Sequence, residues 1–77
     1  MPKLPAVKAR EITRFLERKG FVLDQASGSH FIYYHPTSKR RAVVPKHSRE
    51  IPKGTLASLL REAGFTRDEL IDFLQGR

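Results

Sequence analysis

Apolar residues recur every three or four positions near the start of the chain, a spacing that predicts an amphipathic helix from Val7 to Lys19. Gly20 follows directly, and glycine often ends a helix because it adopts positive φ without steric cost. Charged residues occupy the other side of the predicted helix. The helix should therefore bury one stripe, which consists of Ala9, Ile12, Phe15 and Leu16.

Three short segments rich in β-branched and aromatic residues come next, and they predict an antiparallel meander. We expect strands over residues 21–25, 30–35 and 40–44, with turns at residues 26–29 and 36–39 between them. Side chains alternate across a strand, so each strand presents two faces. In the second strand these faces are His30, Ile32 and Tyr34 on one side, and Phe31, Tyr33 and His35 on the other.

The register of the second and third strands decides which of these faces is buried. If His35 pairs with Arg40, then Ala42 and Val44 join the aromatic face and form a core with it. His30 would then point to the open face of the sheet. A slip of one residue would invert this arrangement.

The last part of the chain predicts two helices. The first should run from Lys53 to Ala63, with an apolar stripe at helical spacing and Gly64 as its cap. Thr66 and Glu69 stand at capping-box spacing, so a short final helix should cover residues 67–75. The predicted fold is α+β: a helix, a three-stranded antiparallel sheet, a helix and a short extra C-terminal helix, with the helices on one sheet face.

The charge of the chain is strongly positive and unevenly distributed. The 77 residues carry 15 Lys or Arg and 8 Asp or Glu, which gives a net charge of +7. Residues 1–60 hold twelve of the basic and four of the acidic residues, whereas residues 61–77 are close to neutral. This excess in the main body favours a polyanionic partner, and nucleic acid is the most common one.

Cysteine is absent, which excludes disulfides and thiolate metal sites and agrees with a reducing compartment. The N-terminal residues form no long apolar run, so neither a signal peptide nor a membrane anchor is expected. We therefore expect a cytoplasmic protein without membrane contact.

His30 is the candidate catalytic residue. It follows a turn, and the ordinary histidine pKa of about 6.5 suits both donation and acceptance of protons near neutral pH. RNA supplies its own nucleophile in the 2′-hydroxyl, so one proton-transfer group with nearby cations suffices for slow cleavage. The alternative is a histidine that only begins a strand and hydrogen-bonds its turn, and chemistry alone favours this alternative because lone histidines are common.

Two basic clusters flank the third predicted strand and could hold phosphates, while a tyrosine on the His30 face could stack on a base. The start of the second helix could also bind an anion, although plain helix initiation explains it equally well. His30 and His35 point to opposite faces and no carboxylate cluster accompanies them, so neither a metal nor another cofactor is expected. The candidate RNA-binding residues are Gly28, Ser29, Tyr34, Lys39, Arg40, Arg41, Lys46, His47 and Lys53.

Several short motifs occur in a specific order and spacing: Lys19-Gly20-Phe21, Gly28-Ser29-His30, Tyr33, His35-Pro36, Val44-Pro45, Pro52-Lys53-Gly54-Thr55-Leu56 and Leu59-Leu60-Arg61-Glu62-Ala63-Gly64. Together they resemble the HicA (YcfA-like) toxin family over roughly residues 3–74. The chain departs from many members at Lys8, where a Ser or Thr would cap the first helix.

The resemblance implies a single toxin domain over residues 1–77 with a fold like that of double-stranded-RNA-binding domains. It also implies translation-independent cleavage of mRNA and inhibition by a HicB-type antitoxin. The catalytic histidine of the family lies in its Gly-Ser-His motif, which corresponds to His30. By this resemblance the protein is an endoribonuclease, an mRNA interferase that lowers translation.

Two other functions compete with this one. A non-catalytic RNA-binding module of the same fold would have the same charge and the same sheet. A helix-turn-helix over residues 56–74 would bind DNA, but its second helix carries Asp68, Glu69 and Asp72 against a single Arg67, which is the wrong charge for a DNA groove. We therefore expect DNA to be contacted only indirectly, through the antitoxin.

Overall fold

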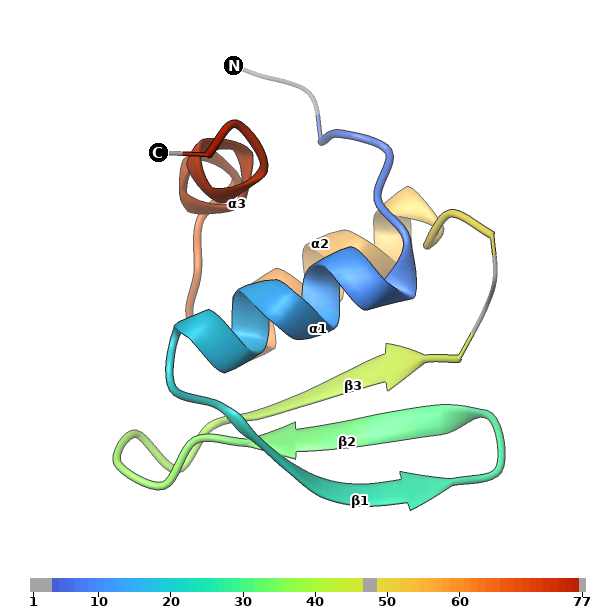
Figure 1. Cartoon of the computed structure of the whole chain (residues 1–77), viewed down its shortest axis with the longest axis vertical. Coiled ribbons are helices and arrows are strands. Elements are labelled where there is room, and N and C mark those ends of the chain that lie inside the picture. The colour runs from blue at the N-terminus through green and yellow to red at the C-terminus, as the bar shows by residue number, and fades with distance from the viewer. Residues whose placement is uncertain (1–3, 47–48, 77) are drawn as a thin grey trace.

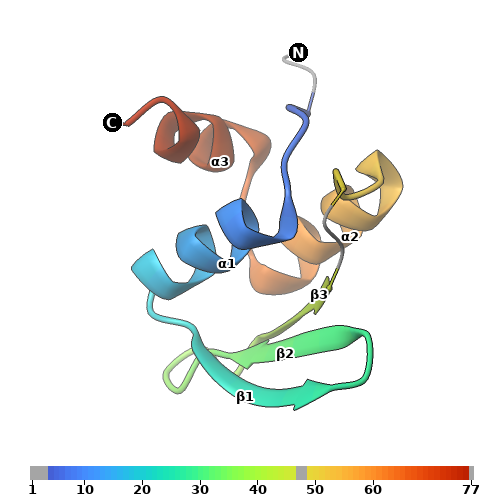
Figure 2. The same ribbon diagram turned by 45° about the vertical axis from the view of Figure 1, so that its right-hand side comes forward.

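The computed structural model of the chain describes residues 4–46 and 49–76. Figure 1 shows a sheet with α1 and α2 on one side of it, and α3 on the far side of α1 from the sheet; the turned view of Figure 2 agrees. This arrangement confirms the predicted α+β fold and is like that of a double-stranded-RNA-binding domain with one extra helix. The elements are α1 (Ala9–Arg18), β1 (Val22–Ser27), β2 (His30–Tyr34), β3 (Arg41–Pro45), α2 (Lys53–Ala63) and α3 (Arg67–Leu74).

α1 begins after Lys8, whose backbone N–H donates to Glu11 Oε1 at 2.9 Å. This carboxylate satisfies one of the N–H groups that a helix start leaves without a partner, so α1 is capped although Lys8 has no hydroxyl. The helix is shorter than predicted at its start, because Lys8 is extended and the Val7 carbonyl accepts from the Ile51 N–H at 2.8 Å. Gly20 has a φ of 96°, which confirms its predicted role at the helix end.

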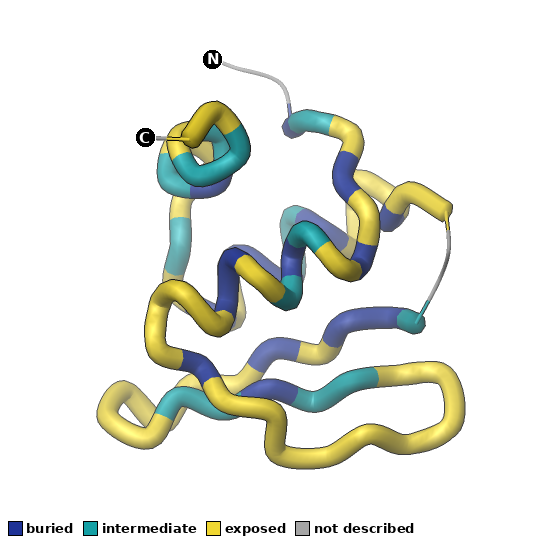
Figure 3. The backbone as a smooth tube through the Cα atoms, in the orientation of Figure 1, coloured by how far each residue is buried: buried dark blue, intermediate teal, exposed yellow. Residues whose placement is uncertain are grey.

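The register of β2 and β3 is the predicted one. Tyr33 lies opposite Ala42 and Phe31 opposite Val44, while the His35 N–H donates to the Arg40 carbonyl at 2.9 Å. The side chains of Tyr33, Ala42 and Val44 are buried. Buried and exposed positions alternate along β3 in Figure 3. His30 therefore lies on the opposite, open face.

β1 differs from the prediction. It continues to Ser27, which pairs with His30, so the predicted four-residue turn is reduced to Gly28 and Ser29. A two-residue hairpin turn keeps the ladder intact up to its last pair, and the φ of 40° at Gly28 fits such a turn. A β-bulge interrupts β1 between Leu23 and Gln25, and all residues of the strand are exposed.

β3 also extends one residue past its predicted end, through Pro45. The sheet order is β1-β2-β3, so β3 is an edge strand. An edge strand tolerates proline, because its outward N–H has no ladder partner to lose. Pro45 thereby lies directly opposite His30.

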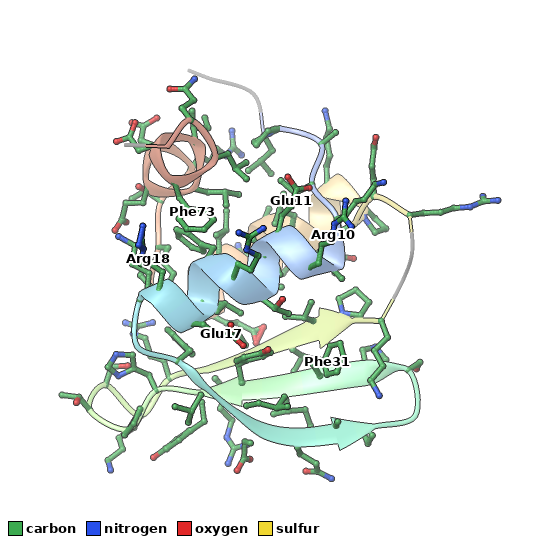
Figure 4. The ribbon with its side chains drawn as sticks, viewed as in Figure 1. Arg10, Glu11, Glu17, Arg18, Phe31 and Phe73 are labelled. Atoms are coloured by element: carbon green, nitrogen blue, oxygen red, sulfur yellow. The ribbon has the colours of Figure 1, made fainter. Side chains whose placement is uncertain are left out.

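The core lies between the sheet and α1 and α2, and it continues between α1 and α3. Phe15 of α1 is fully buried, and its ring meets those of Phe65 and Phe73 edge-on at centroid distances of 5.0 and 5.4 Å. Figure 4 shows Phe73 extending from α3 towards α1. Reciprocal hydrogen bonds between Thr66 and Glu69 confirm the predicted capping box of α3.

α2 has its predicted bounds, Lys53–Ala63, and ends at Gly64 with a φ of 86°. Its buried stripe is the predicted one of Leu56, Leu59, Leu60 and Ala63. The periodicity of apolar residues therefore placed this helix and the face by which it packs.

Tyr33 makes the stability of the core depend on pH. Its hydroxyl donates to Glu17 Oε2 at 3.1 Å, and Figure 4 shows Glu17 on the sheet-facing side of α1. Burial first, and then the bond and charge of Glu17, raise the pKa of Tyr33 above its ordinary value of 10.0.

Because the folded state holds this proton more tightly than the unfolded chain, Tyr33 stabilises the fold fully below pH 10.0, and this contribution is lost as the pH rises through the folded pKa. We expect the free energy of unfolding to fall above pH 10.0, and to fall less steeply in Tyr33→Phe. Urea unfolding at several pH values, with Tyr34→Phe as control, checks this. Equal pH slopes in the wild type and Tyr33→Phe would contradict it.

Candidate functional site

His30 is exposed at the first position of β2. Its Nδ1 lies 3.2 Å from the Ser29 Oγ, which holds the ring from one side. The Nε2 makes no hydrogen bond to any residue in the described part of the chain. One ring nitrogen is thus oriented by the turn, and the other is available for proton transfer to a bound molecule.

The backbone of Lys46 contacts Ser29, the residue that precedes this histidine. Its N–H donates to the Ser29 carbonyl at 2.7 Å, and its ammonium lies 4.7 Å from the centroid of the Phe31 ring. The Gly28-Ser29 turn, His30 and Lys46 therefore gather at one end of the sheet. The Lys46 ammonium lies over Phe31, whose side chain is on the face opposite His30, so the cation and the histidine share an end of the sheet but not a face.

His30 lines a surface cavity of about 350 Å³, which we call the β3–α2 cavity. The cavity runs along the β3 edge of the sheet, where α2 contributes residues at helical spacing from one of its faces. A larger cavity of about 600 Å³ between α2 and α3 contains none of the predicted site residues, so the candidate site is placed at the smaller one. The lining of the β3–α2 cavity is His30, Val43, Pro45, Pro52, Thr55, Ser58, Leu59 and Glu62.

Tyr34 and Arg41 lie on the same face as His30 but at the other end of β2. Tyr34 lies four positions along the strand from His30, a distance of about 13 Å. The Arg41 guanidinium lies 5.4 Å from the centroid of the Tyr34 ring, and it forms an ion pair of 3.5 Å with Asp24. These residues could contact a nucleotide distant from His30, but not the same one.

Arg40 is directed away from this face. Its Nη1 donates to the Glu62 carbonyl at 3.2 Å, and a Cβ added at Gly64 would lie 2.9 Å from the Arg40 Nε. The guanidinium thus binds the C-terminal end of α2, where carbonyl groups lack helical partners. Its neighbour Lys39 has a φ of 64° in the β2–β3 turn. The three basic residues predicted to form one cluster therefore lie apart: Lys39 is in the turn, Arg40 is at the end of α2, and Arg41 is beside Tyr34.

Lys53 begins α2 and borders a different cavity, which also contains Leu4 and Arg67. His47, a further predicted contact, lies outside the described residues. His35 has a structural role, because its Nδ1 accepts from the backbone N–H groups of Thr37 and Ser38 at 3.2 and 3.1 Å.

The described residues contain no group of three or more His, Asp or Glu side chains that could hold a metal ion. No helix among them is long and apolar enough to cross a membrane.

Sequence reasoning missed the α2 side of the cavity. Thr55, Ser58 and Glu62 lie on one face of the helix, and their spacing in the sequence already places them there. The sequence does not reveal that this face borders His30, because their proximity depends on how α2 packs beside β3.

The described residues thus define a small, basic α+β protein that resembles a double-stranded-RNA-binding domain and carries an exposed histidine in a surface cavity. The model of the family described as "HicA toxin of bacterial toxin-antitoxin" matches residues 9–65. The chain therefore belongs to the HicA toxin family, the toxins of bacterial toxin–antitoxin systems, and its partner is an antitoxin. This match confirms the resemblance seen in the motifs. No curated protein matches the chain.

Proposed function

We propose that this toxin is a metal-independent endoribonuclease that cuts mRNA and lowers translation, with His30 as its general acid or base. The observation that carries the proposal is the environment of His30. Its ring is exposed beside a cavity and held through Nδ1 by Ser29. Cleavage through the RNA 2′-hydroxyl requires such a proton-transfer group, together with cations, which the basic excess of the chain can supply.

In this reaction the 2′-oxygen attacks the adjacent phosphorus and the bond from phosphorus to the 5′-oxygen breaks. One proton leaves the 2′-hydroxyl and one proton joins the 5′-oxygen. The His30 Nε2 performs one of these transfers and solvent performs the other. Basic side chains stabilise the negative charge that develops on the phosphate oxygens. The products carry a 2′,3′-cyclic phosphate and a 5′-hydroxyl.

Electrostatics supports RNA as the substrate. A net charge of +7 attracts a polyanion. The pair of Tyr34 and Arg41 offers an aromatic ring and a cation further along the open face, where a single strand leaving His30 could continue. On this proposal the chain acts in the cytoplasm as one toxin domain over residues 1–77, and a HicB-type antitoxin inhibits it.

The test is incubation of the purified protein with a long single-stranded RNA in buffer containing EDTA. We expect cleavage, with cyclic-phosphate and 5′-hydroxyl ends identified by mass spectrometry of short products. Cleavage that requires a divalent ion, or that leaves 5′-phosphates, would overturn the mechanism. Binding of RNA without cleavage would instead identify a non-catalytic RNA-binding module.

A further inference from the structure

The β3–α2 cavity combines apolar walls with a few polar groups. Pro45, Pro52 and Leu59 supply apolar surface, while Thr55 and Ser58 supply hydroxyl groups. A volume of about 350 Å³ lies at the lower end of the range typical of small-molecule sites, about 300–1,000 Å³. The cavity therefore suits one flat, partly polar group such as a nucleobase, and not a longer stretch of RNA.

Glu62 provides the carboxylate of this lining. Arg40 donates to the backbone carbonyl of Glu62, and within residues 4–46 and 49–76 no Lys or Arg forms an ion pair with the carboxylate. A carboxylate repels phosphate, so it does not serve to hold the RNA backbone. It accepts hydrogen bonds and donates none, which suits a base edge that presents N–H groups.

The four RNA bases differ in what they present to a carboxylate. Guanine presents two adjacent donors, N1–H and the N2 amino group, to the two carboxylate oxygens. Adenine and cytosine place a ring nitrogen acceptor beside their amino group, and the N3–H of uracil lies between two carbonyls. Guanine is therefore the base that a Glu side chain binds through two hydrogen bonds.

We propose that the β3–α2 cavity is a guanine-binding subsite beside His30, and that Glu62 makes the toxin prefer RNA with a guanine at one fixed position next to the cut. This inference rests on the proposed ribonuclease function, because it places the base next to the phosphate that His30 acts on. It predicts a sequence preference that arises from α2 and not from the sheet.

The first test maps the cut sites of the wild type and Glu62→Gln on one long single-stranded RNA. We expect wild-type cuts to be enriched about tenfold at sites with guanine at the fixed position, since a bidentate base contact contributes discrimination of that size. Glu62→Gln should lose the enrichment and retain cleavage at other sites. Asp68→Asn makes the same charge change on α3, distant from the cavity, and should keep the preference.

The second test does not depend on cleavage. Guanosine, adenosine, cytidine and uridine monophosphates are titrated into the isotope-labelled protein, with binding followed by NMR at the amides of Thr55, Ser58 and Glu62. We expect guanosine monophosphate to bind these residues most tightly, and Glu62→Gln to remove its advantage. Equal binding of all four nucleotides, or an advantage that survives Glu62→Gln, overturns the subsite.

The two tests separate the two proposals. Cleavage without base preference, together with equal nucleotide binding, would refute the subsite and leave the ribonuclease standing. Selective binding of guanosine monophosphate without any RNA cleavage would refute the ribonuclease and leave a guanine site on an RNA-binding protein.

Discussion

His30→Ala is expected to lower the rate of RNA cleavage at least about 100-fold, because a positioned proton-transfer group typically contributes about 10²–10⁴-fold. The side chain is exposed, and its one hydrogen bond within the described residues is to the Ser29 hydroxyl. The substitution removes no core contact, so the fold should remain. The measurement is the initial rate of cleavage of a long single-stranded RNA in EDTA buffer, after circular dichroism has shown equal folding.

Gln25→Ala is the matched control for this variant. Gln25 is an exposed strand residue opposite Ile32, outside the cavity and the basic residues. Its rate should equal that of the wild type. Cleavage by His30→Ala at the wild-type rate would show that another group, or a contaminant, performs the chemistry.

Phe15→Ala is expected to destabilise the fold by about 3–5 kcal/mol, the usual effect of removing a large aromatic ring from a core. Phe15 is fully buried and meets the rings of Phe65 and Phe73, so its loss leaves a cavity where α1, α3 and the α2–α3 connection meet. Domains are typically stable by only about 5–15 kcal/mol, and a chain of this size lies towards the low end. A large part of the molecules should therefore be unfolded at moderate temperature.

Urea unfolding followed by circular dichroism measures this effect. Val22→Ala serves as the control, because Val22 is 51% exposed on the edge strand and its loss should change the free energy of unfolding by no more than about 0.5 kcal/mol. A similar midpoint for Phe15→Ala and Val22→Ala would mean that α3 does not pack on α1 as described.

Local patterns in the sequence predict the helices and the strand register well. The stripe from Leu56 to Ala63 and the glycine after it determine α2, since periodicity and capping act within a few residues. Pairing of His35 with Arg40 follows from the short turn between them. The end of β1 is harder to predict, because Ala26 and Ser27 suit a turn as well as a strand and the two-residue hairpin decides between them.

The site is less predictable than the fold. The motif and its position on a strand identify His30 as a candidate, but the partners of Arg40 depend on contacts far along the chain. Arg40 and Glu62 are 22 positions apart and meet only when α2 packs beside β3. The same packing brings Glu62 to the cavity of His30, so a list of basic residues selected by charge alone omits the one acid at the site.

β1 has no neighbouring strand on its outer side among the described residues, and all of its side chains are exposed. Such an edge offers backbone N–H and C=O groups with which another chain can pair, as in aggregation. The bulge after Leu23 and the charge of Asp24 oppose this pairing. Repulsion between molecules of charge +7 adds to the protection, and it acts over only about 8 Å at physiological ionic strength. The resistance of the protein to aggregation thus depends on the bulge in β1 and on repulsion between positively charged molecules. Concentrated salt screens this repulsion and leaves only the bulge and Asp24 to protect the strand edge.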